Sequence, residues 1–187
     1  MKIAYIIFNG VTWLDFIGFY DAVSRLKSMN FMIDLSWDIC SYTDTGADNF
    51  GLKIIPDKVL PDLKIYNAIF IPGGHGTRTL IHDTAFLNWI RTGKDAEYKF
   101  SVCTGSLILG AAGYLEGKKA TTNFLEYETL KNYCSEIIKE KVVEDGNVIT
   151  AGAVSSSIDL GLHVCEKWVG PVAREQIQTR MGYNNFR

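Results

Sequence analysis

The sequence predicts an α/β fold: a three-layer, flavodoxin-like sandwich in which helices cover a mostly parallel β-sheet. Two features lead to this prediction. Short apolar runs alternate with helical patterns from end to end, as in chains built from βαβ units. Several of these runs end in glycines or small polar residues, and parallel sheets carry their binding and catalytic sites at the carboxyl ends of the strands. At 187 residues the chain is long enough for one substantial core and short for two domains, so we expect a single domain over 1–187.

Composition and charge narrow the classes of function. The chain is 47% hydrophobic and 21% charged, and its formal net charge of −2 offers no broad basic surface for nucleic acid. The N-terminal apolar segment is interrupted by Asn9, Gly10 and Asp15 and makes a poor signal peptide. No apolar run approaches the roughly 20 residues needed to span a bilayer. We therefore expect a cytoplasmic protein that has neither a membrane nor a nucleic acid as partner.

The first strand and helix carry the first candidate residue. Residues 2–8 form a short apolar run bounded by turn formers, which predicts a buried strand. Residues 13–29 carry apolar side chains at mostly three- and four-residue spacing, which predicts an amphipathic helix. Asp15 falls in its first turn, where an acidic side chain can also simply cap the helix or favour its dipole. Residues 33–39 predict the second strand.

A glycine-rich turn follows a strand in the middle of the chain. After a short extra strand or hairpin arm at 51–55, the apolar run 68–71 leads into Pro72-Gly73-Gly74-His75-Gly76-Thr77. Glycines let backbone N–H groups point at a ligand, so this turn is a candidate anion or oxyanion site, with a plain tight turn as the alternative. Its spacing fits neither a Rossmann fingerprint nor a P-loop. Of the three histidines, His75 is best placed to face a site, and no paired spacing indicates a metal.

The next strand ends at a cysteine. A helix over about 84–97 precedes the stretch 100–112, which begins as an apolar strand, turns at Cys103 and continues as a helix. Ser101 and Gly105 flank Cys103 where a larger side chain would obstruct the sharp strand-to-helix turn of a nucleophile elbow. The amides and dipole of the following helix are expected to lower the pKa of the Cys103 thiol. A buried structural cysteine is the alternative.

The last third of the chain continues the alternation. We expect a strand at 120–122, a helix at 124–133, a hairpin with arms 142–144 and 147–150, and helices ending near Trp168 and Arg180. The four cysteines lie far apart and form no Cys-x-x-Cys pair, so we expect thiols rather than a zinc site or a redox motif.

Three candidate segments follow three of the predicted strands. In a mostly parallel sheet, sites form at the carboxyl ends of the strands. Asp15, the Gly73-Gly74-His75 turn and Cys103 are therefore predicted to meet at one edge of the sheet. Their convergence favours a functional cysteine over a structural one.

Five segments carry a resemblance to a known family. They are the first strand through Asp15 and residues 71–76, 101–113, 119–122 and 145–152. On these motifs, which extend over nearly the whole chain, the sequence resembles the DJ-1/PfpI superfamily, with its class I glutamine-amidotransferase-like fold. The version Cys103-Thr104-Gly105-Ser106, together with Asp15, is most similar to the isonitrile hydratase branch and to the ligand-binding halves of some AraC-type regulators.

The resemblance implies a cysteine enzyme that acts on a small molecule without a metal or other cofactor. Cys103 is implied as the nucleophile and Asp15 as its acid–base partner, with a pKa raised by burial and by the nearby thiolate. The amides of Gly74 and Thr104 are implied to stabilise negative charge, and the Thr104 hydroxyl to orient substrate or water. The Gly73-Gly74-His75 turn is implied to bind substrate. The implied reaction is hydration of an isonitrile to an N-substituted formamide.

Differences from the relatives narrow the range of expected reactions. The protease-like branch has histidine directly after the cysteine, where this chain has Thr104, so peptidase activity is not expected. Many relatives have Thr-Thr-His where this chain has Thr121-Thr122-Asn123, and an asparagine cannot act as a base. Glyoxalase-type chemistry and a non-catalytic redox or ligand sensor, with Cys103 as the sensing thiol, are the alternative functions.

The resemblance also implies a homodimer, with the first helix near the interface. The aromatic residues there exceed what one buried face needs: Trp13, Phe16, Phe19 and Tyr20. Packing of all four within the chain is the alternative. Related regulators continue into a helix-turn-helix region, whereas this chain ends at Arg187, so DNA binding is not expected.

Overall fold

A central sheet of seven strands organises the molecule. The computed structural model describes residues 1–183; the last four residues of the predicted single domain, 184–187, lie outside the described part. The strands are β1 (Lys2–Ile7), β2 (Ser36–Ser41), β3 (Gly46–Ala47), β4 (Lys53–Ile54), β5 (Lys58–Val59), β6 (Ala68–Ile71), β7 (Tyr98–Val102), β8 (Lys119–Ala120), β9 (Glu136–Ile137), β10 (Val142–Asp145) and β11 (Val148–Ala151). The central sheet has the order β10-β11-β7-β6-β1-β2-β5, in which only β10 runs antiparallel to its neighbour.

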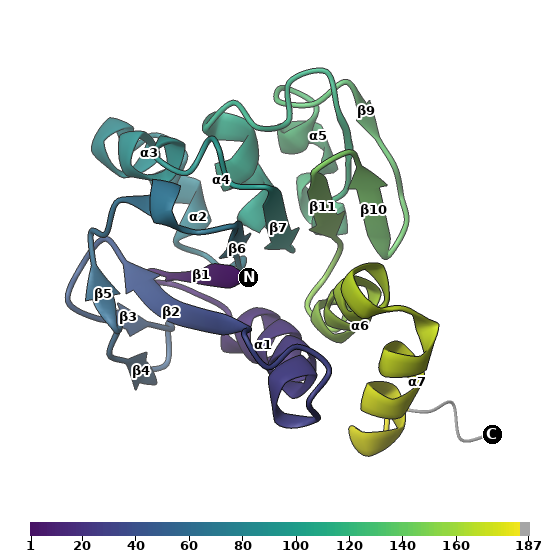
Figure 1. Cartoon of the computed structure of the whole chain (residues 1–187). Coiled ribbons are helices and arrows are strands. Elements are labelled where there is room, and N and C mark those ends of the chain that lie inside the picture. The colour runs from purple at the N-terminus through teal and green to yellow at the C-terminus, as the bar shows by residue number, and fades with distance from the viewer. Residues whose placement is uncertain (184–187) are drawn as a thin grey trace.

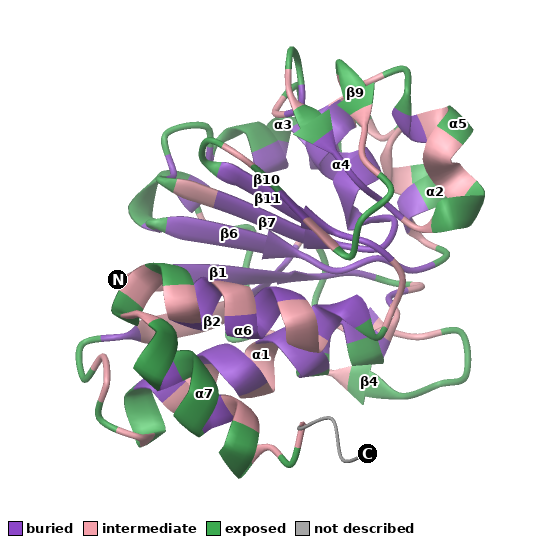
Figure 2. Ribbon diagram, turned by 90° about the vertical axis from the view of Figure 1, so that its right-hand side faces the viewer, coloured by how far each residue is buried: buried purple, intermediate pink, exposed green. Residues whose placement is uncertain are grey.

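Helices cover both faces of this sheet. They are α1 (Trp13–Ser28), α2 (Thr77–Leu80), α3 (Thr84–Arg91), α4 (Gly105–Ala111), α5 (Tyr127–Leu130), α6 (Ser156–Val169) and α7 (Pro171–Arg180), with 3₁₀ turns η1 (Leu63–Ile65) and η2 (Phe124–Glu126). Helices α1, α6 and α7 lie on one face and α2 to α5 on the other (Figure 1). Figure 2 shows the buried strands enclosed between these layers. The predicted three-layer α/β fold with a mostly parallel sheet is thus confirmed. Within residues 1–183, no helix is both long and apolar enough to cross a bilayer.

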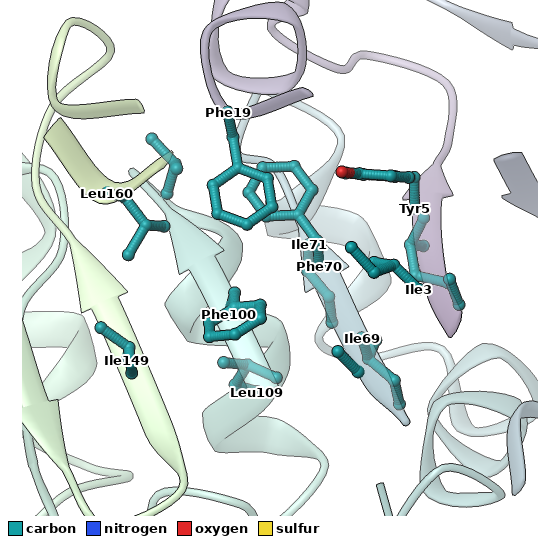
Figure 3. Packing of buried hydrophobic residues seen from close by; sticks show 14 of the residues in the cluster. Ile3, Tyr5, Phe19, Ile69, Phe70, Ile71, Phe100, Leu109, Ile149 and Leu160 are labelled. Carbon is teal, nitrogen blue, oxygen red and sulfur yellow. The ribbon is translucent and has the colours of Figure 1, made fainter. Parts of the chain in front are cut away.

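Aromatic packing fixes α1 on the sheet. The Phe19 ring of α1 stacks on Phe70 of β6 with ring centroids 4.2 Å apart, and it also contacts Phe100 of β7 at 5.6 Å (Figure 3). All three rings are fully buried, and each aromatic pair of this kind stabilises a fold by about 0.5–1.5 kcal/mol beyond its buried area. Asp15 lies four residues before Phe19 and therefore shares its helix face. Packing of Phe19 thus holds Asp15 against the ends of β6 and β7.

Some element boundaries differ from the predictions. The second strand was predicted over 33–39, but it begins at Ser36, and Ile33 is exposed in the turn before it. The helix predicted over 124–133 is a 3₁₀ turn, η2, followed by the single turn of α5. The helix predicted to reach residue 97 ends at Arg91. Backbone hydrogen bonds close turns at these places, for example from Leu35 N to Met32 O (3.1 Å) before β2 and from Thr92 N to Trp89 O (3.0 Å) after α3.

Candidate active site

The three predicted segments meet at the carboxyl edge of the sheet. Strand β6 lies between β1 and β7, so the loops that follow these three parallel strands are neighbours. Backbone hydrogen bonds join the first two loops: Thr12 N donates to Gly73 O (2.9 Å), and Gly76 N donates to Gly10 O (3.1 Å). The predicted convergence of Asp15, the glycine turn and Cys103 is therefore present in the fold.

Cys103 occupies a sharp turn between β7 and α4. Its φ of 54° lies in the left-handed region, which a non-glycine residue adopts only when its surroundings hold it there. Its N–H is shared between Ala151 O (3.0 Å) and Gly152 O (2.7 Å). Its carbonyl accepts hydrogen bonds from Thr122 Oγ1 (2.9 Å) and Ser106 Oγ (3.1 Å). The local geometry is that of a nucleophile elbow.

Gly73 lies where the candidate groups come closest together. A Cβ at this position would lie 2.7 Å from Thr104 N, 2.8 Å from Asp15 Oδ2 and 2.8 Å from Cys103 Cβ. These distances are shorter than real Cβ contacts, so only glycine fits here without displacing backbone. The missing side chain is what allows the carboxyl of Asp15 to approach Cys103.

The Asp15 side chain is fully buried and does not cap its own helix. Thr12 is the N-cap residue of α1, while Asp15 Oδ2 accepts a hydrogen bond from Gly73 N (2.9 Å) in another segment. Asp15 Oδ1 is buried without a hydrogen-bond partner among the described residues. Burial raises the pKa of Asp15 to about 7, although the Gly73 N–H and the Cys103 thiol act in the opposite direction. A carboxyl in this state takes up and releases a proton near neutral pH.

The Cys103 thiol is less acidic than the sequence suggested. Burial, followed by the negative charge of Asp15, raises the pKa of Cys103 to about 11. Hydrogen bonds from Asn123 and from Thr104 oppose this rise but do not reverse it. The predicted lowering of this pKa is therefore wrong as a net effect, because burial and the Asp15 charge outweigh the lowering by the Thr104 N–H at the helix N-terminus. At neutral pH the pair is a thiol beside a carboxyl group that can accept its proton.

Thr104 and Gly74 are bonded to each other. Gly74 N donates to Thr104 Oγ1 (3.0 Å), and the same hydroxyl donates to Gly74 O (3.2 Å). The backbone N–H of Thr104 favours the thiolate form of Cys103 and so lowers the pKa of that thiol. Of the two amides predicted to stabilise negative charge, the Gly74 N–H is thus already paired with the Thr104 hydroxyl, and a substrate oxyanion would have to replace that hydroxyl.

His75 does not join the buried group. Its side chain is exposed, and within residues 1–183 it forms no hydrogen bond with Asp15, Thr104 or Cys103. A role for His75 in substrate binding stays a prediction. In the same range, no cluster of three or more histidine, cysteine, aspartate or glutamate side chains is arranged to hold a metal ion.

Asn123 is the site neighbour for which the sequence suggested no positive role. Its Nδ2 lies 3.4 Å from Cys103 Sγ. In the sequence, Asn123 stands out only as a departure from relatives that have histidine at this position. The one available signal was its position directly after Thr121-Thr122, a segment shared with those relatives.

Comparisons with known proteins identify the family and the relatives of this chain. A model of the DJ-1/PfpI family matches residues 1–167. The chain is 34% identical to an isonitrile hydratase of Pseudomonas putida over 98% of its own length and 78% of the relative's. A crystal structure of a ThiJ/PfpI family protein from Pseudomonas syringae superposes with a TM-score of 0.88 at 29% identity, covering 100% of this chain and 76% of that one. Drosophila melanogaster DJ-1beta, at 18% identity and a TM-score of 0.82 over 96% of both chains, shares the fold.

Proposed function

Because the chain belongs to the DJ-1/PfpI family, we propose that it hydrates a small isonitrile to an N-substituted formamide, with Cys103 as nucleophile and Asp15 as acid–base partner. The observation that carries this proposal is the buried Asp15 carboxyl, whose pKa of about 7 suits proton transfer, placed against the Cys103 thiol across Gly73. The similarity to an isonitrile hydratase supplies the substrate class.

The first chemical step joins the Cys103 sulfur to the substrate. The Asp15 carboxylate accepts the thiol proton as sulfur attacks the terminal carbon of the isonitrile. Asp15 then delivers that proton to the same carbon. The product is a thioimidate in which carbon carries one hydrogen, the sulfur and a double bond to nitrogen. Asp15 ends this step as a carboxylate, ready to act again.

The second step releases the product with water. A water molecule adds to the thioimidate carbon and gives up one proton to Asp15, while the nitrogen becomes protonated by the second water proton. The carbon–sulfur bond breaks, the carbon–oxygen bond becomes a carbonyl, and Asp15 returns its proton to the Cys103 thiolate. One isonitrile and one water thus yield one formamide. The Thr104 hydroxyl, beside the sulfur, is the group that would orient this water.

Direct turnover tests the proposal. Purified protein is incubated with a simple alkyl isonitrile, and the formyl proton of the formamide is followed by NMR. Formamide must appear faster than in buffer and in proportion to the protein concentration. If no formamide forms above the buffer rate, the proposal is wrong.

The pH dependence of kcat/KM reports which form of Asp15 acts. In this mechanism the active form has a thiol at Cys103 and a carboxylate at Asp15. Since the pKa of Asp15 is raised to about 7, kcat/KM should rise about tenfold per pH unit below 7 and level off above it. Initial rates between pH 5 and pH 9, corrected for uncatalysed hydrolysis in acid, check this expectation. A flat profile would exclude Asp15 as the base.

The alternative functions receive less support from the same site. Peroxide attacks the thiolate form of cysteine, and burial with the Asp15 charge raises the pKa of Cys103 to about 11, which disfavours a peroxide-sensing thiol. For glyoxalase-type chemistry, Asn123 offers no base where many relatives have histidine. Lactate formation from methylglyoxal that requires Cys103, without isonitrile turnover, would favour that alternative.

We also propose a homodimer that covers an apolar face beside the site. Trp13, Phe16 and Phe19 are buried and Tyr20 is partly buried against the core, which favours the alternative that these four aromatic residues pack within the chain. Exposed apolar side chains instead lie on α1 and on the β3–β4 arm: Leu14, Ile17, Phe50, Leu52 and Ile55. Helix and arm are joined by Trp13 Nε1, which donates to Leu52 O (3.0 Å), and a second copy of this chain offers an equally apolar face.

Light scattering after size exclusion tests the dimer. We expect twice the chain mass for the wild type at micromolar concentration. We expect a monomer for Phe50→Asp, because Phe50 is 95% exposed and its replacement affects no packing within the chain. Phe124 is also exposed, but it lies in η2, away from α1 and the β3–β4 arm. Phe124→Asp is therefore the matched control and should stay dimeric. A monomeric wild type would contradict the proposal.

A further inference from the structure

The orientation of the Asn123 amide is fixed by its second hydrogen bond. Asn123 Oδ1 accepts from Leu125 N (3.0 Å), which can only donate. The reversed orientation would place two donors against each other, so the NH₂ group must be the one that faces the sulfur. The contact of 3.4 Å between Asn123 Nδ2 and Cys103 Sγ is therefore a hydrogen bond with nitrogen as donor.

The segment that carries Asn123 is tied to the elbow on both sides. Thr122 Oγ1 donates to the carbonyl of Cys103 itself (2.9 Å), and Thr121 N donates to Thr150 Oγ1 (2.9 Å) in the neighbouring strand. After Asn123, Glu126 N closes a turn on the Asn123 carbonyl (2.9 Å). The donor to the sulfur thus belongs to a preorganised segment and requires no rearrangement when charge develops.

We propose that Asn123 is a catalytic residue that stabilises the Cys103 thiolate by hydrogen bonding, both when the carbon–sulfur bond forms and when it breaks. An amide neither gains nor loses a proton near neutral pH. The sulfur proton consequently has one destination in the site, the Asp15 carboxyl, and Asn123 strengthens the leaving group without competing for that proton. The catalytic part of this inference rests on the proposed function, whereas the stabilisation of the thiolate does not.

Alkylation of Cys103 by iodoacetamide measures the thiolate without any isonitrile. The rate is followed at pH 8 by mass spectrometry of the peptide containing Cys103, so that modification of the other three thiols does not interfere. Asn123→Asp retains the oxygen that accepts from Leu125 N but turns a carboxylate towards the sulfur. We expect alkylation to slow by at least about tenfold, the effect of one pH unit on the thiolate population.

Two further variants distinguish loss of the hydrogen-bond donor from the effects of added charge and of misfolding. Asn123→Ser retains a side chain that can cap η2, yet its hydroxyl is too short to reach the sulfur, and alkylation should slow about threefold or more. Asn132→Asp adds the same charge at an exposed asparagine and should alkylate at the wild-type rate. Circular dichroism and thermal unfolding establish that each variant is folded.

The outcomes distinguish this inference from the proposed function. If folded Asn123→Ser and Asn123→Asp proteins alkylate at the wild-type rate, the inference is wrong even where the wild type hydrates isonitriles. If both variants alkylate slowly and also lose kcat with little change in KM, the catalytic role is supported. If both alkylate slowly but the wild type produces no formamide, the proposed function and the catalytic role fall, and only the stabilised thiolate stands.

Discussion

Replacing Cys103 by alanine is expected to lower isonitrile hydration by at least about 10⁴-fold, the scale seen when a covalent nucleophile is removed. Without the sulfur, no bond to the terminal carbon can form, and Asp15 alone has nothing to deprotonate except water. The fold should survive, because alanine is smaller than cysteine and the backbone hydrogen bonds that hold the elbow do not involve the thiol. Initial rates of formamide formation check the loss, with circular dichroism as the measure of folding.

A second cysteine provides the control for this experiment. Cys134 is a half-buried free thiol that lies outside the site, and Cys134→Ala should hydrate isonitrile at the wild-type rate. A folded Cys103→Ala protein that retained a tenth of the activity would contradict covalent catalysis. The reaction would then have to proceed by direct attack of water.

The sheet and the meeting of the loops could be predicted because both follow from local patterns. Apolar runs such as 68–71 and 100–102 mark buried strands, and parallel strands place the residues that follow them at one edge. The position of Asp15 then depends only on helix periodicity, which puts it on the same face as Phe19. The positions of Cys103 and the glycine turn could be predicted from the order of the strands alone.

The acidity of Cys103 and the role of Asn123 could not be predicted, because both arise from tertiary contacts. A helix N-terminus after Cys103 can be predicted from the sequence, whereas the burial and the Asp15 charge that raise the pKa of Cys103 depend on packing. Asn123 reaches the sulfur only because Thr122 ties its segment to the elbow carbonyl. Likewise, Ile33 fits a strand pattern, but the chain turns there before β2 begins.

The substitution Asp15→Asn should lower activity and raise stability together. Asparagine can keep the acceptor for Gly73 N–H but cannot take the thiol proton, so kcat/KM should fall by about 10²–10⁴, the usual contribution of a general acid–base group. Stability changes in the other direction because the wild-type carboxyl must be buried. In the folded protein the Asp15 carboxyl keeps its own proton up to a pH of about 7, whereas in the unfolded chain it releases that proton near pH 3.8.

The sign of the stability effect follows from these two pKa values. Between them the folded state binds more protons than the unfolded state, so the contribution of Asp15 to the free energy of unfolding falls as pH rises, by on the order of 4 kcal/mol in all. Urea unfolding of wild type and Asp15→Asn at pH 5 and pH 8 measures it. The advantage of the variant should grow at pH 8. The exposed Asp44 provides the control, and Asp44→Asn should show no such growth.

A third readout of Asp15→Asn separates a catalytic carboxyl from a structural one. The charge of Asp15 is the second cause, after burial, of the raised pKa of Cys103, so removing it should make the thiolate more accessible and speed alkylation of Cys103. If the Asp15 carboxyl were structural, its replacement would lower stability. If it served only to ionise the thiol, its replacement would slow the alkylation of Cys103. Lower turnover, higher stability and faster alkylation at pH 8 are the combination expected when the buried Asp15 carboxyl, with a pKa of about 7, carries the proton from sulfur to substrate.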